Sequence, residues 1–267
     1  MFERDFHQKI YTVLSHLDAP FLASCRAYFG GGTLVSLRHG EYRLSQDIDF
    51  MCPIGLGYRQ LRQAIIDRGY SAIFNSFERI SLPREIQANQ YGIRFPVIID
   101  QTQIKFEIVV EGYIQFDSPD LPSWSPVACL SNTDSFAEKL LANADRWADR
   151  RKDSRDIIDL SMQRLASPIP AEAIAKAENA YPVVEPLIRA IQNFQQQPEY
   201  RAECFNRLAV KEPSRVIDGL DLLACDLGLE ATARTFGETN WDYLDYQEAQ
   251  PNQNEHDEIS NDEDLEI

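Results

Sequence analysis

The chain has 267 residues, of which 44% are hydrophobic and 25% charged, a composition typical of a globular protein that can bury a sizeable core. No apolar stretch approaches the roughly 20 residues that a membrane-spanning helix needs. The charged N-terminal segment MFERDFHQKIYTVL has the pattern of an amphipathic helix rather than of a secretory signal. We therefore expect a cytoplasmic protein that has no membrane partner.

The net charge of −16 is distributed unevenly along the chain. Residues 241–267 contain ten Asp and Glu and no Lys or Arg, so that residues 1–240 together carry only −6. The acidic segment is poor in apolar residues, which predicts a disordered tail. A folded part with a net charge of −6 argues against a protein that coats DNA, but it allows one local basic surface.

Five cysteines are scattered along the chain without a CxxC spacing: Cys25, Cys52, Cys129, Cys204 and Cys225. Their odd number and irregular spacing favour buried free thiols over a disulfide framework or a zinc site.

The first half of the chain alternates between helical and strand patterns. Residues 3–17 predict an amphipathic helix that ends at Asp18-Ala19-Pro20. The elements expected after it are a glycine turn and helix from residue 30, a strand over 47–51, a helix over 58–69, and strands over 70–82, 90–100 and 103–110.

The pattern changes after a proline-rich connector at residues 118–126. Two helices are expected over residues 133–164, the first with a capping signal at Asn132-Thr133-Asp134, and helical patterns continue over 170–239. The predicted organisation is an α/β core over residues 1–130, a helical portion over 131–240 and an acidic tail over 241–267.

The first candidate binding feature is the turn Gly30-Gly31-Gly32-Thr33, which precedes a predicted helix. Free backbone N–H groups at the positive end of a helix dipole suit a phosphate. The turn lacks the lysine of a Walker loop and the spacing of a dinucleotide fingerprint. By itself it fits a tight structural turn equally well.

The second feature is the pair Asp47 and Asp49, which point to one face of the predicted strand because successive strand residues alternate. The apolar neighbours Ile48, Phe50 and Met51 place this strand within a sheet, where two like charges repel unless a cation joins them. Two carboxylates of this kind suit Mg²⁺. A pair of solvated carboxylates on an exposed face is the weaker alternative.

A third carboxylate is expected from Glu107, because it lies on another strand of the same unit and neighbouring strands are about 5 Å apart. Glu111 and Asp100 compete for this position. The alternative for Glu107 is an ordinary charge on the open face of the sheet, beside Lys105.

The densest cationic stretch places Lys139, Arg146 and Arg150 within helical reach of one another. A lysine on such a helix could neutralise the β- and γ-phosphates of a nucleotide. The alternative is a solvated helix face whose cations pair with neighbouring acids, namely Glu138, Asp145, Asp149 and Asp153.

Together these motifs resemble the AbiEii/AbiGii-type nucleotidyltransferase toxins, a branch of the DNA polymerase β-like nucleotidyltransferase superfamily. The resemblance covers roughly residues 20–165, in the segments GGGTLVSLRHGEYRLSQDIDF (30–50), IKFEIVV (104–110) and AEKLLANADRWADRRKDSRDIIDL (137–160). The family pattern falls on Gly31-Gly32-Thr33, Arg43-x-Ser45-x-Asp47-x-Asp49-Phe50, Lys139 and Arg155-Asp156-x-x-Asp159.

The resemblance implies an α+β fold, in which a nucleotidyltransferase-like mixed sheet with packed helices is followed by a helical C-terminal portion. It implies that Asp47 and Asp49 hold Mg²⁺ and that Glu107 acts near the acceptor hydroxyl as a ligand or base. The remaining implied roles are triphosphate binding by Gly31, Gly32, Thr33, Arg43 and Ser45, phosphate neutralisation by Lys139, and orientation of the reacting groups or closure of the site by Asp156 or Asp159.

The implied reaction moves an NMP group from a nucleoside triphosphate to an acceptor hydroxyl and releases pyrophosphate. In such toxins the acceptor is often RNA, tRNA in particular, and a cognate antitoxin neutralises the toxin. Two alternatives stay open: a catalytically inactive nucleotidyltransferase fold used for binding, and a transferase that acts on a protein or a small molecule. The intact set of motif residues favours the active enzyme.

Overall fold

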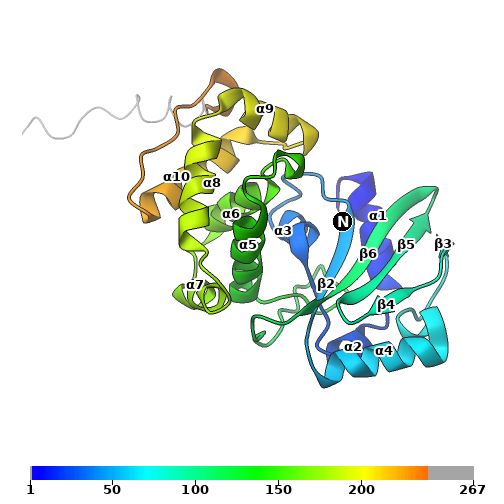
Figure 1. Ribbon diagram of the computed structural model, residues 1–267. Helices are drawn as coiled ribbons and strands as arrows, with labels where there is room; N and C mark the ends of the chain where they lie inside the picture. The colour runs from blue at the N-terminus through cyan, green and yellow to red at the C-terminus, as the bar shows by residue number, and fades with distance from the viewer. Residues whose placement is uncertain (1, 240–267) are drawn as a thin grey trace, which may run out of the picture.

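The computed structural model describes residues 2–239, so the acidic tail predicted over 241–267 lies outside the described residues. Up to the end of the sheet, the elements are α1 (Asp5–Ser15), α2 (Ala19–Ser24), β1 (Tyr28–Gly30), α3 (Gly31–Arg38), β2 (Asp47–Pro53), α4 (Leu56–Arg68), η1 (Gly69–Ala72), β3 (Ile80–Ser81), β4 (Gln87–Asn89), β5 (Gly92–Ile99) and β6 (Thr102–Glu111) (Figure 1).

The strands form one mixed sheet in the order β1-β2-β6-β5-β3, with β4 also paired to β5. Only β2 and β6 run parallel; the other neighbours are antiparallel. The register sets Asp49 opposite Gly30 on one side and opposite Glu107 on the other. The end of β1, the paired aspartates and the candidate third carboxylate therefore lie side by side on three adjacent strands.

The alternation predicted for β2 and β6 is confirmed. On β2 the apolar residues Ile48 and Phe50 are fully buried, whereas Asp47, Asp49 and Met51 are half-buried on the other face. On the buried face, three rings stack in a row across neighbouring strands, with centroid distances of 5.6 and 4.6 Å: Phe50, Phe106 and Phe95. This aromatic row fixes the buried face, and so turns both aspartates to the opposite one.

The second half of the described chain is helical. Its elements are α5 (Asn132–Arg146), η2 (Arg150–Lys152), α6 (Arg155–Ala166), α7 (Ala171–Glu178), α8 (Val184–Gln195), α9 (Pro198–Arg207), α10 (Pro213–Asp226) and η3 (Phe236–Glu238). These helices gather beside the sheet, and α3 lies between β2 and the pair α5 and α6 (Figure 1). None of the described helices is long and apolar enough to cross a membrane.

The apolar core continues across the boundary predicted at residue 130, from Ile10 on α1 to Ala224 on α10. At one point in the helical portion two backbones touch, since a Cβ on Gly219 would overlap the carbonyl oxygen of Ser161. This contact brings α10 directly against α6. The division into residues 1–130 and 131–240 stays a prediction.

The strand predicted over residues 70–82 is wrong. The segment opens with the 3₁₀ turn η1, and only Ile80–Ser81 pairs with β5. Its aromatic residues serve the core from irregular backbone, because the Tyr70 and Phe74 rings pack edge-on against Phe95 at 5.1 and 6.0 Å. The apolar composition of residues 70–82 reflects their packing in the core and not a strand period. The short elements α2 and β1 were not predicted.

Three smaller expectations need correction. Helix α5 is capped by Ser131, whose hydroxyl accepts from the backbone N–H of Asp134 at 3.0 Å, one residue before the predicted capping signal. The same helix ends at Arg146, so Arg150 lies on the separate turn η2. Four cysteines are buried free thiols as expected, but Cys225 is exposed.

Candidate active site

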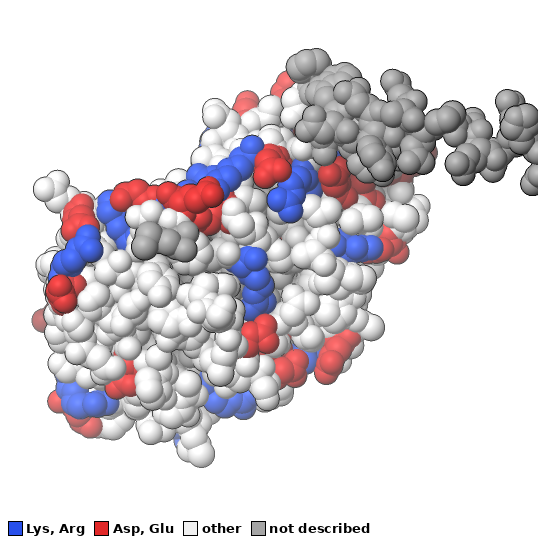
Figure 2. All heavy atoms as spheres, turned by 180° about the vertical axis from the view of Figure 1, so that it is seen from behind, with Lys and Arg blue, Asp and Glu red and all other residues white. Residues whose placement is uncertain are grey.

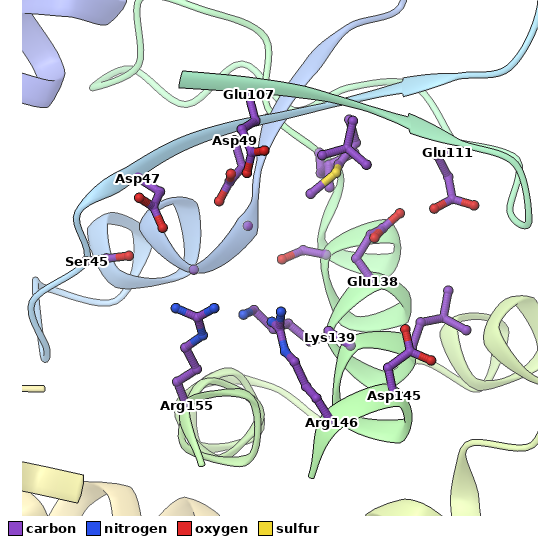
Figure 3. A pocket seen from close by; sticks show the side chains of 18 of the residues that line it. Ser45, Asp47, Asp49, Glu107, Glu111, Glu138, Lys139, Asp145, Arg146 and Arg155 are labelled. Atoms are coloured by element: carbon purple, nitrogen blue, oxygen red, sulfur yellow. The ribbon is translucent and has the colours of Figure 1, made fainter. Parts of the chain in front are cut away.

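The carboxylates on the face of the sheet opposite the aromatic row line a cavity of about 430 Å³. Helix α5 and the start of α6 form the other side of this cavity (Figure 3). Of the residues predicted for the site, those that line the cavity are Gly31, Gly32, Arg43, Ser45, Asp47, Asp49, Glu107 and Lys139. Thr33, Asp156 and Asp159 are not among the lining residues. The cavity volume is in the range of about 300–1,000 Å³ that is usual for small-molecule sites.

The first turn of α3 leaves no room for a side chain at Gly31 or Gly32. Gly31 has a φ of +69°, and a Cβ there would lie 2.6 Å from an oxygen of Asp49. A Cβ on Gly32 would overlap the guanidinium of Arg43. Both glycines are therefore required for the aspartate and the arginine to approach the first turn of α3, where free N–H groups meet the cavity.

Thr33 acts beneath this turn. Its side chain is fully buried, and its hydroxyl lies 2.5 Å from the backbone oxygen of Asp47, to which it donates, and 2.8 Å from the hydroxyl of Ser45. The residue thus ties the start of α3 to the entry of β2. The structure places it as a support for Ser45 and Asp47 and not as a cavity-lining side chain.

A buried histidine of α1, which the sequence analysis did not identify, holds the loop before β2 through a hydrogen bond. His7 of α1 is fully buried between the carboxylate of Glu41, at 2.8 Å, and the backbone N–H of Ser45, which donates to its Nε2 at 3.2 Å. Burial lowers the pKa of His7, although Glu41 opposes the shift. A neutral imidazole can accept from Ser45 and so hold the loop in place.

The two aspartates of β2 are crowded. Burial raises the pKa of Asp49 to about 6, and the neighbouring charges of Asp47 and Glu107 add to the effect. Such a group becomes fully ionised at neutral pH more readily if a cation lies beside it. Hard carboxylate oxygens on one strand face are the donors that Mg²⁺ prefers, so Asp47 and Asp49 fit a hard divalent ion.

The candidate third carboxylate, Glu107, lies opposite Asp49 but is paired with cations. Glu107 forms ion pairs with Arg94 and with Lys105, both on the same face of the sheet. Within residues 2–239, no group of three His, Cys, Asp or Glu side chains is arranged to hold a metal ion. Asp100 does not line the cavity, because it lies in the β5–β6 turn and pairs there with Arg79. Glu107 and Glu111 are the competitors that line it.

The acids of the segment Arg155-Asp156-x-x-Asp159 lie under the cavity and hold its cations. Asp159 is fully buried; its oxygens accept from Nε and Nη2 of Arg43 at 2.6 and 2.8 Å and lie 2.5 Å from Nζ of Lys139. Asp156 is 4% exposed and contacts Lys139 at 3.0 Å and Arg146 at 2.5 Å.

These acids stay ionised. Burial alone would raise the pKa of Asp159, but Arg43 and Lys139 more than offset it and hold the pKa below its usual range. The same balance, with Lys139 and Arg146 as the cations, lowers the pKa of Asp156. Two buried carboxylates therefore fix three cations whose outer sides line the cavity, and leave one positive charge in excess.

Several cavity residues were not predicted as site residues. Arg155 lies at the first turn of α6, points into the cavity (Figure 3), and makes no ion pair within the described part of the chain. The family pattern includes Arg155, but no role was assigned to it. Two other lining residues were named only as candidates, Glu111 for the third carboxylate and Arg146 for the cationic stretch. The lining residues for which no site role was considered are Lys105, Glu138, Asp145 and Lys152.

The fold has solved relatives. A candidate nucleotidyltransferase from H. pylori superimposes with a TM-score of 0.51 at 13% sequence identity, over 84% of this chain and 95% of its own. JHP933 from Helicobacter pylori gives 0.48 at 15% identity, over 93% and 97% of the two chains. The first of these likenesses shows that the fold is of the nucleotidyltransferase kind, and the predicted α+β fold class is confirmed.

Family membership is defined by the sequence. Residues 12–204 match the AbiEii family, described as the nucleotidyl transferase AbiEii toxin of a type IV toxin–antitoxin system. The chain belongs to this family, and the resemblance drawn from its motifs is confirmed. Membership in a toxin–antitoxin family implies an antitoxin partner. No protein of curated function matches the sequence.

Proposed function

We propose that the protein is the toxin of its system and transfers an NMP group from a nucleoside triphosphate to an acceptor hydroxyl, with Mg²⁺ as the metal. The observation that carries the proposal is the convergence in one cavity of the α3 glycine turn, the Asp47 and Asp49 carboxylates and the cations beneath them. No part of this set is a phosphate site by itself. Together they supply the groups that phosphoryl chemistry needs.

The triphosphate is bound by the cationic side of the cavity. Lys139, Arg43 and Arg146 present three positive charges against the two of Asp156 and Asp159. Arg155 and Lys152 also line this side, and neither makes an ion pair within the described residues. The N–H groups of the α3 turn face the same space, so the site is electropositive where phosphate oxygens would lie.

The reaction joins an acceptor oxygen to the α-phosphorus and breaks the bond from that phosphorus to the pyrophosphate oxygen. Asp47 and Asp49 would hold Mg²⁺, which when bound neutralises phosphate charge and polarises the α-phosphate. Lys139 and Arg146 stabilise the negative charge that collects on the leaving pyrophosphate. Glu107 lies opposite Asp49, on the side of the site away from these cations, where an acceptor hydroxyl can approach (Figure 3).

RNA, tRNA in particular, is the proposed acceptor. On the face shown in Figure 2, acidic and basic side chains of the described residues are interspersed, without an extended cationic surface. This face therefore offers RNA no broad electrostatic field, and we propose that an RNA end is held locally, near the cavity. Arg94 and Lys105 are 42% and 55% exposed and supply positive charge beside Glu107.

The test uses each of the four α-³²P nucleoside triphosphates with Mg²⁺ and total tRNA, and separately with a cell lysate. We expect wild-type protein and the control Asp67→Asn, an exposed aspartate on α4, to label RNA. Asp49→Asn should not label it. Label in the protein or small-molecule fraction would replace the proposed acceptor. Nucleotide binding without transfer to any fraction would identify an inactive binding fold.

A further inference from the structure

Helix α5 presents two different charged stripes to the cavity. Residues seven apart nearly eclipse on an α-helix, so Lys139 and Arg146 form one stripe, and Glu138 and Asp145 form another that is rotated by about 100°. Figure 3 shows Lys139, Arg146 and Arg155 directed toward the β2 aspartates, and Glu138 and Asp145 turned toward the side of Glu111. The cavity therefore has a cationic end and an acidic end.

The acidic end combines three carboxyl side chains with two tyrosine rings. Glu138 and Asp145 come from α5, Glu111 from the end of β6, and the rings of Tyr113 and Tyr181 lie in edge contact with centroids 5.9 Å apart. Within the described residues, no salt bridge involves any of the three carboxylates. This contrasts with the cationic end, where Asp156 and Asp159 are each held by two cations.

Two of these acids have unmet hydrogen-bonding capacity. Oε1 of Glu138 is sealed from solvent and has no hydrogen-bond partner among residues 2–239. Glu111 accepts from the backbone N–H groups of Tyr113 and Ile114, the second at 3.1 Å, and retains a second oxygen. Burial raises the pKa of Glu138 well above its usual range, and the adjacent charge of Glu111 adds to this. The buried Oε1 of Glu138 is costly to leave without a partner, and a hydrogen-bond donor from a ligand would relieve this cost.

The chemistry of this end specifies a ligand rich in N–H donors. Its polar side chains are carboxylates, which accept hydrogen bonds, and tyrosines, whose rings offer an apolar face. The apolar residues Leu141 and Ala142 complete the wall on α5. A flat heterocycle with an exocyclic amine matches both properties. A phosphate does not, because three carboxylates would repel it.

We propose that the acidic end of the cavity, Glu111, Glu138 and Asp145 with Tyr113 and Tyr181, binds the nucleobase of the triphosphate and selects bases that carry an exocyclic amine. The inference rests on the proposed function, since it requires the triphosphate to occupy the cationic end. Helix α5 then contacts both parts of one nucleotide, with the phosphates against Lys139 and Arg146 and the base against Glu138 and Asp145.

The experiment is titration calorimetry of the full-length protein with the Mg²⁺ complexes of ATP, GTP, CTP, UTP and ITP, and of pyrophosphate. UTP and ITP carry a carbonyl oxygen where CTP and ATP carry an amine, and ITP lacks the 2-amino group of GTP. We expect both to bind about 10- to 100-fold more weakly than the tightest amine-bearing nucleotide, the range for leaving a buried polar group without its hydrogen-bond partner. In Glu138→Gln the ratio should fall to less than about 3-fold.

The control is Glu172→Gln, which removes an exposed carboxylate on α7 and should keep the wild-type ratio. Thermal unfolding of each variant checks that it is folded, and Asp145→Asn replaces Glu138→Gln if the latter is not. Equal binding of all five nucleotides, or a preference that survives both substitutions, would overturn the inference and leave the proposed function standing if pyrophosphate still binds. Failure of wild-type protein to bind either nucleotides or pyrophosphate would overturn the proposed function as well.

Discussion

Substitution of Asp159 by asparagine perturbs the buried network that holds the cations of the cavity. Asp159 is fully buried and is contacted by Arg43, Lys139 and the hydroxyl of Tyr42. The asparagine is close in shape but neutral, so it leaves Arg43 without its acidic partner and Lys139 with Asp156 alone. Removal of one partner of a buried ion pair costs about 3–5 kcal/mol, and we expect a loss of unfolding free energy in this range.

The assay is urea unfolding at pH 7, followed by fluorescence, on wild-type protein, Asp159→Asn and the control Asp226→Asn. Asp226 pairs with Arg164 but is 40% exposed, so the loss of its charge should cost less than about 1 kcal/mol. Each aspartate is paired with an arginine through two hydrogen bonds, so the large difference follows from the burial of Asp159 and from its further contacts with Lys139 and Tyr42.

The pH dependence of the same difference gives a second check. The pKa of Asp159 is lowered in the folded protein, so its contribution is fully present above the unfolded value of about 3.9 and is lost as the pH falls through the folded value. The gap between wild type and Asp159→Asn should therefore narrow below about pH 4. A loss below 1 kcal/mol at pH 7, or a gap that widens with acid, would refute the assigned role of Asp159.

Three further predictions concern binding. In Gly32→Ala the added methyl overlaps Arg43, so the KM for the nucleotide should rise by about tenfold or more in steady-state assays. Arg155→Met should raise this KM about 10- to 100-fold. It should leave the free energy of unfolding in urea within about 0.5 kcal/mol of wild type, because no ion pair within the described residues is lost. An unchanged KM would exclude Arg155 from phosphate binding. Arg94→Met releases one cation from Glu107 and should lower the Mg²⁺ concentration that gives half-maximal transfer; an unchanged Mg²⁺ requirement would indicate that Glu107 acts apart from the metal.

The sequence was most informative where a short period decides which way a side chain points. Alternation over residues 47–51 placed both aspartates on one face, and the buried aromatic row on the other face follows from the same period. The parallel register that sets Asp49 opposite Glu107 has no such local signal, since the two residues are 58 positions apart in the chain. Strand adjacency and the family resemblance made Glu107 a candidate neighbour of the aspartates, but neither fixed the register.

Burial of charged groups was the property that sequence reasoning could not supply. The spacing of Asp156 and Asp159 puts them on one side of α6, but nothing in it shows that this side faces Lys139 and Arg43 under the cavity. In the same way, Glu111 and Glu138 are 27 positions apart and meet only because the end of β6 packs near α5. Local sequence does not show that these acids are buried, because their burial is decided by tertiary packing.

The central claim is transfer of the α-phosphate, and paired labels test it most directly. Wild-type protein is incubated with Mg²⁺, total tRNA and a nucleoside triphosphate labelled with ³²P at either the α- or the γ-position. We predict that α-label appears on RNA and γ-label only in pyrophosphate, and that both signals vanish in Asp49→Asn. Label from the γ-position on the acceptor, or transfer that persists without Asp49, would contradict the account.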